Sequence, residues 1–402
     1  MSLELQCLSL DERLSGDYQP VDSSTDPNAK QVLRRWQEIA GGSQADIFAK
    51  RLSLDGLTES GVMERLGRLS RRPGAPEPYW LYDANAVVGD LMAPVAPAPD
   101  QAANDFAFGP LLSPLIDGAL RDIHQHTSWI QLLTPQARAS ATRHLWQSLT
   151  ELFGMPLYEA FVAWRSTNAA NTHDFTDFVA HMRRSGFTRL FEQYPVLARV
   201  AGTLRRQWVV SYGRMLDRLG NDAELLASTF YRGASFKVND LKYGLSDPHG
   251  AGDVVVELCA IDGSSIFYKP RSLACDQVVK SFLDCLTNLD PTLDLRVPRF
   301  IERGDYGWVE GVKVSSAADS TALGRYYRRA GAWLGLFHLL NASDMHMENV
   351  LACGEHPIPI DFETILQALT NRPHEPKYGE SAHWLGRVRQ GGVISAVAVG
   401  HR

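Results

Sequence analysis

The chain has little cysteine, no long apolar run and no excess of positive charge, and each shortage excludes a class of protein. Its five cysteines are scattered through 402 residues without any C-x-x-C pair, so we expect reduced thiols in the cytosol and no zinc site. No stretch is long enough to span a membrane, and the acidic N-terminus is not typical of a signal peptide. These features predict a cytoplasmic protein without membrane insertion.

The charge balance also limits the partners. A formal net charge of -6 and a pI near 6.1 give no general attraction for polyanions, so we expect no nucleic-acid partner. A hydrophobic content of 45% with 21% charged residues is typical of a globular chain that buries a substantial core in two domains.

The order of local patterns predicts an α+β fold. Between Phe108 and Leu219 the pattern is helical almost throughout, and strand-like alternation begins only after Phe236. We therefore expect a mainly helical region over residues 1–220, with a proline-rich loop at 94–99, followed by a mixed catalytic region over residues 221–402.

The first candidate site residues lie on a predicted hairpin. Residues 254–260 alternate between apolar and polar, Asp262-Gly263 is a turn signal, and 265–269 returns as the partner strand. Lys269 then projects from a sheet, where its ammonium can reach nucleotide phosphates, and Arg271 adds a second cation.

The helix expected over residues 275–286 offers an acidic partner for that lysine. Asp276 and Asp284 are both available, and their spacing does not distinguish them. Taken alone, Lys269 is also compatible with a solvated lysine on a strand.

A second group of candidates surrounds a short hairpin near residue 350. Apolar residues at three- and four-residue intervals from Leu323 through Tyr327 and Leu334 to Phe337 predict a helix that leads into a loop. We expect Trp333 and Phe337 in the core, and Arg328 and Arg329 on a solvated face.

The loop after this helix has the sequence Asp344-Met-His346-Met-Glu-Asn349. The strands expected over 349–353 and 358–360, around a turn at 354–357, then deliver Asp361. Kinase-like folds hold a metal nucleotide with two carboxylates and an amide of this kind near one hairpin. Phosphoryl transfer needs oxygen ligands for Mg²⁺ and a group that orients the attacking hydroxyl. The alternative is that these residues are loop and cap residues.

A glycine-rich connection precedes the first hairpin. Residues 244–252 contain Asp247 and His249 among three glycines, which permit close backbone approach to phosphate, while the imidazole suits proton transfer. The segment matches neither the P-loop nor G-x-G-x-x-G. For His249, a satisfied polar residue and a catalytic group both remain open.

Five motifs in order carry a family resemblance: Ser246-Asp-Pro-His249, Tyr268-Lys-Pro-Arg271, Asp344-x-His346-x-Glu-Asn349, Gly354-Glu-His-Pro357 and Ile360-Asp-Phe-Glu363. Over about residues 70–370 the chain resembles the dehydratase domain of class II (LanM-type) lanthipeptide synthetases. That family is similar in fold to lipid kinases with an added helical region. Its members phosphorylate Ser and Thr of a precursor peptide with ATP and Mg²⁺, and then eliminate the phosphate.

Carried over residue by residue, the resemblance implies a phosphorylation site. Lys269 would bind nucleotide phosphates, Asp344 would orient or deprotonate the substrate hydroxyl, and His346 belongs to the same loop. Asn349 and Asp361 would hold Mg²⁺. The implied partner is a precursor peptide with its leader.

The resemblance also implies an elimination step and shows two departures. Asp247 and His249 match positions that the family uses to remove the α-proton and expel phosphate, but Asp253 stands where the family usually has a basic residue. Family domains continue well past Asp361, through residues needed for elimination and into a zinc-dependent cyclase, whereas residues 387–402 do not resemble that continuation. We therefore expect a two-lobed kinase-like region with an incomplete C-terminal lobe.

Two functions follow from these expectations. The first is an ATP-dependent peptide kinase that keeps the phosphorylation residues without the means to eliminate, with a separate cyclase as a further candidate partner. The second is a non-catalytic remnant or leader-peptide-binding module.

Overall fold

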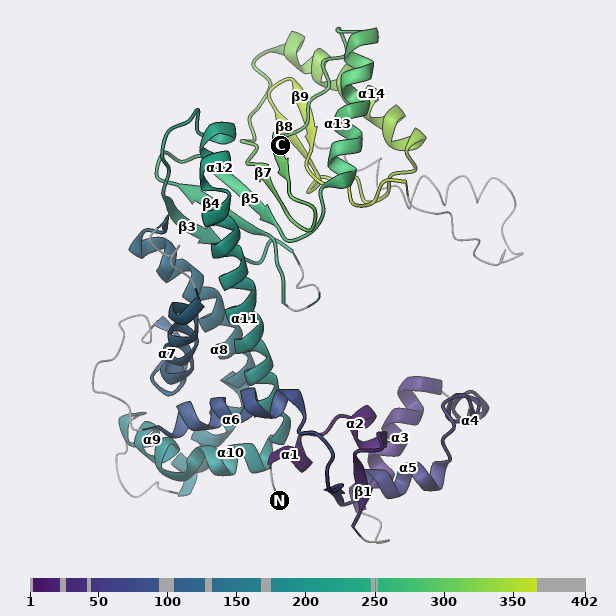
Figure 1. Ribbon diagram of the computed structural model, residues 1–402, viewed down its shortest axis with the longest axis vertical. Coiled ribbons are helices and arrows are strands. Elements are labelled where there is room, and N and C mark those ends of the chain that lie inside the picture. The colour runs from purple at the N-terminus through teal and green to yellow at the C-terminus, as the bar shows by residue number, and fades with distance from the viewer. Residues whose placement is uncertain are drawn as a thin grey trace. The chain divides into compact units, whose positions relative to one another are not determined.

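The computed structural model divides the chain into two compact units (Figure 1). It describes residues 3–21, 27–41, 45–93, 105–126, 132–167, 175–246, 250 and 252–366. Unit 1 comprises residues 1–125 and 145–209, and unit 2 comprises residues 126–144 and 210–402. The three boundaries fall at the last residue of α7 (Gly109–His126), within α8 (Pro135–Thr167) and within α11 (Pro195–Asn221).

Unit 1 is mainly helical. Its small sheet pairs β1 (Tyr18–Pro20) with β2 (Leu69–Arg71) in antiparallel register. Next to it, α3, α4 and α5 bury Leu33, Phe48 and Val62 in one cluster. Besides α8 and α11, the helices are α1 (Leu3–Gln6), α2 (Leu10–Leu14), α3 (Pro27–Gly41), α4 (Ala45–Leu54), α5 (Glu59–Leu66), α6 (Tyr79–Met92), α7 (Gly109–His126), α9 (Phe175–His181), the π-helical η3 (Met182–Gly186) and α10 (Phe187–Gln193).

Unit 2 is built on a five-stranded antiparallel sheet with the order β3-β4-β5-β7-β6. The predicted hairpin is confirmed, since Leu258 pairs with Ile266 and Gly263 takes a φ of +77° at its turn. The strands are β3 (Val238–Lys242), β4 (Val256–Ala260), β5 (Ser265–Lys269), β6 (Phe300–Glu302) and β7 (Gly307–Glu310).

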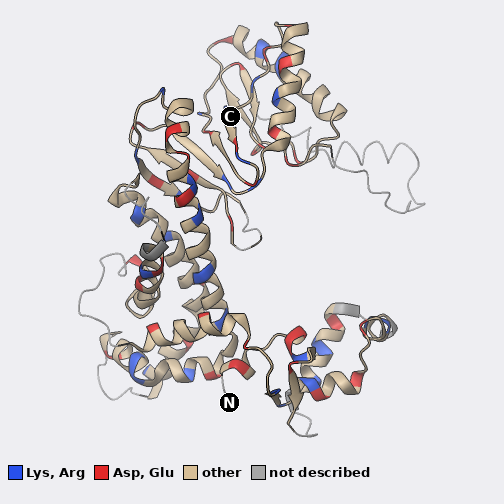
Figure 2. Ribbon diagram, in the orientation of Figure 1, with Lys and Arg blue, Asp and Glu red and all other residues tan. Residues whose placement is uncertain are grey.

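The C-terminal part of α11 fixes one face of this sheet. Basic residues recur along α11 (Figure 2), and Arg218 donates a hydrogen bond of 2.6 Å to the Tyr268 hydroxyl. Asp222, which is 1% exposed, accepts hydrogen bonds of 2.8 Å from the Tyr306 hydroxyl and from Trp308 Nε1. Because successive side chains of a strand point to opposite faces, anchoring Tyr268 on this face turns Lys269 to the other.

Gly307 lies directly opposite Lys269 in the register of β5 and β7. A Cβ at this position would lie 2.3 Å from Leu273 Cδ1 and 2.7 Å from the carbonyl oxygen of Ile301. The sheet therefore needs glycine beside the lysine because two neighbours fill the space.

Four further elements of unit 2 lie together, whereas α12 (Ala223–Phe230) follows α11 and lies beside β4 (Figure 1). The four are α13 (Ala274–Leu289), α14 (Ser320–Leu339), β8 (Val350–Cys353) and β9 (His356–Pro359). Of these, α13, α14 and the segment around the hairpin share a core that includes Leu283, Trp333 and Phe362. This core holds the loop at 344–349 against two helices.

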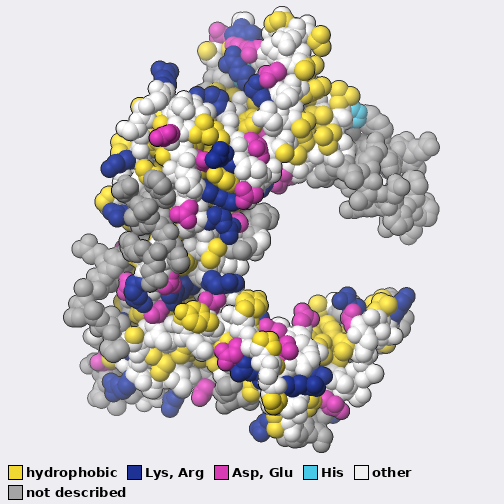
Figure 3. Space-filling model, viewed as in Figure 1, with side chains coloured by type: hydrophobic (Ala, Val, Ile, Leu, Met, Phe, Trp, Pro, Cys, Tyr) yellow, Lys and Arg dark blue, Asp and Glu magenta, His cyan; other side chains and the backbone are white. Residues whose placement is uncertain are grey.

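The outer face of α13 exposes several large apolar side chains. Val278, Phe282 and Leu289 are all exposed, and Figure 3 shows hydrophobic side chains gathered over this helix. The inner face buries Asp276 and Val279, so one carboxylate lies on the buried side of an otherwise apolar contact.

The structure corrects three details of the sequence prediction. Tyr327 and Leu334 are exposed, because the buried face of α14 runs through Arg329, Trp333 and Phe337 instead. Arg329 was predicted on a solvated face and is buried, and two half-buried carboxylates, Asp294 and Glu355, bind it there. The turn at 354–357 is shorter than predicted, because residues 356–357 pair within β9.

At the level of fold class, the mixture of helices and strands agrees with the predicted α+β fold. The helical pattern over residues 108–219 is confirmed by α7 to α11 wherever the structure describes that region. The loop at 94–99 and the segment at 387–402 lie outside the described residues. No helix in the described ranges is both long and apolar enough to cross a membrane.

Candidate functional site

The end of β5 and the end of the β8–β9 hairpin meet in unit 2. Lys269 Nζ donates a hydrogen bond of 2.8 Å to the carbonyl oxygen of Ile360 and lies 3.9 Å from Asp361 Oδ2. The lysine is only 7% exposed, and this burial lowers its pKa, while Asp361 acts in the opposite direction. Two motifs separated by about 90 residues thus form one site.

Arg271 lies among three carboxylates. Its Nη2 donates to Asp361 Oδ1 at 2.5 Å, and its Nε lies 3.1 Å from Glu363 Oε2. Its Nη1 is 4.0 Å from Asp276 Oδ2. The guanidinium therefore links the hairpin to the first turn of α13.

Asp276 is a site residue that the sequence left undecided. It is 5% exposed, and burial raises its pKa, while the charges of Lys269 and Arg271 oppose that change. Within the described part of the chain, its Oδ2 has no hydrogen-bond partner. Asp284, the alternative, is exposed and forms an ion pair with Lys280.

The periodicity of α13 contained a signal for this choice. Asp276, Val279 and Leu283 follow one another at three- and four-residue spacing and are the buried residues of the helix. A carboxylate in phase with the apolar stripe is the one that faces the lysine.

The backbone of Asp344 adopts a left-handed conformation, with φ of +63°. Its carbonyl oxygen accepts hydrogen bonds of 3.0 Å from the His346 backbone N–H and 2.9 Å from Asn349 Nδ2. A non-glycine residue in this region costs of order 1–3 kcal/mol, and such outliers cluster at functional sites. The loop therefore holds Asp344 in a conformation that the residue alone disfavours.

His346 orients the carboxylate of Asp344. Its Nδ1 accepts a hydrogen bond of 3.2 Å from the Glu348 backbone N–H, and its Nε2 lies 3.2 Å from Asp344 Oδ1. Because Nδ1 is an acceptor, a neutral ring carries its proton on Nε2 and directs it to Asp344.

The hairpin places Asn349 and Asp361 at neighbouring strand ends. The Ile360 backbone N–H donates a hydrogen bond of 3.0 Å to the carbonyl oxygen of Asn349, and Val350 pairs with Pro359. All four of Lys269, Asp344, Asn349 and Asp361 are thus connected through one short element.

The donor set suits a hard divalent cation. Asn349 uses its Nδ2 to bind Asp344, which leaves its Oδ1 as an acceptor. Asp361 contributes a carboxylate, and the buried oxygen of Asp276 lacks a hydrogen bond. Carboxylate and amide oxygens are the ligands that Mg²⁺ takes in nucleotide sites, so Asn349 and Asp361 are the residues that would hold it.

Asp247 and His249 lie outside the described residues. The neighbouring Asp253 stands where the resemblance predicts a positively charged residue. It accepts hydrogen bonds from Arg214 of α11 through both carboxylate oxygens, at 2.9 and 2.6 Å. Its charge is therefore used in an ion pair that fixes the end of the connection to the helix.

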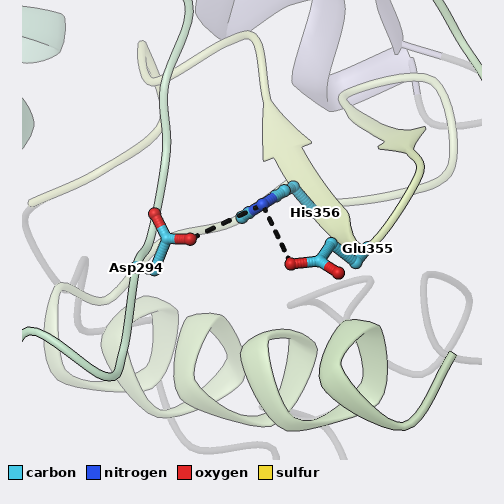
Figure 4. A group of neighbouring side chains, drawn as sticks. All are labelled: Asp294, Glu355 and His356. Atoms are coloured by element: carbon cyan, nitrogen blue, oxygen red, sulfur yellow. Dashed lines mark ion pairs between the residues drawn. The ribbon is translucent and has the colours of Figure 1, made fainter. Parts of the chain in front are cut away.

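A separate cluster at the turn of the hairpin contains Asp294, Glu355 and His356 (Figure 4). His356 Nε2 lies 3.6 Å from a carboxylate oxygen of each acid. Arg329 binds the same two carboxylates, at 3.0 and 2.9 Å, and hydrogen bonds from Arg325 and Arg329 lower the pKa of Glu355 to about 2. Because arginine already supplies the positive charge, we interpret the cluster as an ion-pair clasp between the hairpin and α14.

Comparison with known proteins gives two partial matches. Residues 194–388 match a family model described as a domain of unknown function, DUF4135. Over 130 residues the chain is 32% identical to the lacticin 481/lactococcin biosynthesis protein LcnDR2 of Lactococcus lactis subsp. lactis. That alignment covers 28% of this chain and 13% of the relative, so the chain matches only a small part of the longer protein.

Proposed function

We propose that this chain acts in lanthipeptide maturation and that unit 2 transfers phosphate from ATP to Ser or Thr of a precursor peptide. The observation that carries the proposal is the approach of Lys269 to Asp361, at 3.9 Å, where a strand end and a hairpin end meet. The similarity to a lacticin 481 biosynthesis protein supports the choice of peptide substrate. The leader of the precursor and a separate cyclase are the partners that we propose with it.

The proposed arrangement is two-lobed and kinase-like. Strand β5 of the sheet provides Lys269, Arg271 follows two residues after its end, and the segment after α14 provides the loop at 344–349 and Asp361. Phosphoryl transfer requires a cation for the phosphates and oxygen ligands for the metal. Here the strand would supply the cation and the loop would supply the ligands.

Each residue then has a role set by its chemistry. Lys269 and Arg271 bind phosphate oxygens, which are the groups that ammonium and guanidinium ions recognise. Asn349 and Asp361 would hold Mg²⁺, which would neutralise charge on the phosphates. Asp344 orients the substrate hydroxyl and accepts its proton as the oxygen bonds to the γ-phosphorus and ADP leaves, and His346 keeps the Asp344 carboxylate in position.

Mass spectrometry of a precursor peptide incubated with the chain, ATP and Mg²⁺ tests the proposal. Gain of one phosphate is the expected result, and loss of water would mean that the chain also eliminates. An unmodified peptide would refute the enzyme, and binding of the leader without turnover would then support the non-catalytic module.

Matched variants make the test specific to the site. Asp361→Asn keeps the shape of the side chain and removes a metal ligand, so phosphorylation should fall by at least about a hundredfold. Asp284→Asn, on the exposed side of α13, makes the same chemical change away from the site and should leave the rate unaltered. Phosphorylation that survives Asp361→Asn would show that the metal assignment is wrong.

A further inference from the structure

The carboxylates of the site are held by two cations of different accessibility. Lys269 and Asp276 have side chains only 8% and 6% exposed. Arg271 and Asp361 are about a quarter exposed, and Glu363 is 55% exposed. The lysine is therefore an inner, fixed cation, whereas the arginine is an outer one that solvent reaches.

Arg271 uses the atoms that a metal ion would need. Asp361 Oδ1 accepts from Arg271 Nη2 at 2.5 Å and from the Glu363 backbone N–H at 3.2 Å, and its Oδ2 faces Lys269. Glu363 is also taken by Arg271, through Nε at 3.1 Å. A divalent cation cannot bind Asp361 Oδ1 while the guanidinium remains in this position.

The formal charges favour an exchange. Asp276, Asp361 and Glu363 supply three negative charges, and Lys269 and Arg271 supply two positive ones. If a divalent cation replaces Arg271, the carboxylates are balanced by the metal and the lysine. The released guanidinium is then free to bind an anion, for which its planar fork is suited.

We propose that Arg271 is an exchangeable counter-cation: it closes the carboxylate site of the ligand-free chain, and a divalent cation displaces it so that it binds phosphate oxygens. The inference rests on the proposed function for the identity of the anion. Metal binding and phosphate binding are then coupled through one side chain, because the metal releases the group that the phosphate uses.

Removing the arginine should change the two affinities in opposite directions. In the full-length, nucleotide-free chain, Arg271→Ala should bind Mn²⁺ about tenfold more tightly than the wild type, the size of one charge-assisted hydrogen bond. The same variant should bind ATP about tenfold more weakly when Mn²⁺ is saturating, and should change less in ATP affinity without metal, because Asp361 and Glu363 then hold the arginine of the wild type. Calorimetry measures both, and electron paramagnetic resonance of free Mn²⁺ gives an independent value for the metal.

Two further variants make the comparison specific. Arg299→Ala removes an arginine of the same unit that is bound to Glu310 through Nη2, at 2.5 Å, and Nε, at 3.0 Å, so it controls for the loss of one positive charge and should alter neither affinity. Arg271→Lys keeps the charge without the planar fork and should give an intermediate Mn²⁺ affinity. It also serves if thermal unfolding shows that Arg271→Ala does not fold.

The results separate this inference from the proposed function. Opposite shifts in Mn²⁺ and ATP affinity without any phosphopeptide would support the exchange and refute the kinase. Phosphopeptide formation by the wild type, with Mn²⁺ affinity unchanged or weaker in Arg271→Ala, would overturn the exchange alone. Absence of Mn²⁺ binding by both wild type and Arg271→Ala would also overturn it.

Discussion

Replacing Lys269 by Met should destabilise unit 2 far more than the same change at an exposed ion pair. Met retains most of the apolar stem of the lysine and removes only the ammonium group. That group donates a hydrogen bond of 2.8 Å to Ile360 and compensates the buried charge of Asp276. Its loss leaves a carboxylate that is 5% exposed, with Arg271 Nη1 at 4.0 Å as the remaining nearby cation.

The expected magnitude follows from the burial of both partners. Removing one member of a buried pair costs about 3–5 kcal/mol, because the remaining charge is uncompensated. The hydrogen bond to Ile360 contributes about 1.5–3 kcal/mol of that loss, the usual value for a charged donor. Burial lowers the pKa of Lys269 and raises that of Asp276. Both shifts mean that burial disfavours the charged form of the group.

Adding Asp276→Asn should therefore restore part of the unfolding free energy that Lys269→Met removes. In Lys269→Met/Asp276→Asn the orphaned charge is removed, and replacement of a whole buried pair is often neutral or stabilising. We expect the double variant to recover about 2–3 kcal/mol relative to the sum of the single changes. Urea unfolding followed by fluorescence of Trp308 and Trp333, which are buried in unit 2, provides the free energies.

An exposed ion pair on α13 provides the control for these substitutions. Lys280 and Asp284 form an ion pair at 2.5 Å on the exposed side of α13, and Lys280→Met should cost less than about 1 kcal/mol because exposed pairs contribute little. If the losses from Lys269→Met and Asp276→Asn simply add, the two groups are not coupled and the inner cation has been misidentified.

Three further predictions concern stability and activity. Asp344→Gly should raise thermal stability by about 1 kcal/mol, because glycine adopts a φ of +63° without strain, while phosphorylation by the mass-spectrometric assay is lost. Gly307→Ala should lower the unfolding free energy by about 1–3 kcal/mol, since the new Cβ meets the Ile301 carbonyl oxygen at 2.7 Å; no loss in chemical denaturation would contradict the packing. Burial lowers the pKa of His356 from 6.5, so the unfolded chain takes up a proton first and stability should fall as the pH drops below about 6.5, with a flatter pH profile in His356→Gln.

Local patterns were sufficient to predict the elements that carry the site. Alternation around Asp262-Gly263 gave the β4–β5 hairpin, and turn residues at Gly354 gave the β8–β9 hairpin. The helix expected over residues 275–286 is α13, three residues longer at its C-terminal end. These features depend on neighbours in the chain, which a single sequence displays.

Residues whose environment comes from distant segments were harder to predict. Arg329 was assigned to the surface because charge is usually solvated, yet Asp294 and Glu355 bind it from segments 26 to 35 residues away. Gly307 gave no local signal, since Leu273 and Ile301 create its requirement. The roles of ATP and Mg²⁺ stay predictions, because they depend on ligands as well as on the fold.

Several residues of unit 2 lower the stability of the fold, and these losses are an argument for the proposed enzyme over the non-catalytic module. Lys269 and Asp276 are buried against their preference, and Asp344 is held in a left-handed conformation. Stability alone would favour an apolar pair in place of the first two residues and glycine in place of the third. Peptide binding by a surface would need none of them, whereas phosphate transfer needs a cation, its acidic neighbour and a positioned carboxylate together. Residues that reduce stability at one place, in a fold that otherwise follows the usual preferences for burial and backbone conformation, are expected at a functional site.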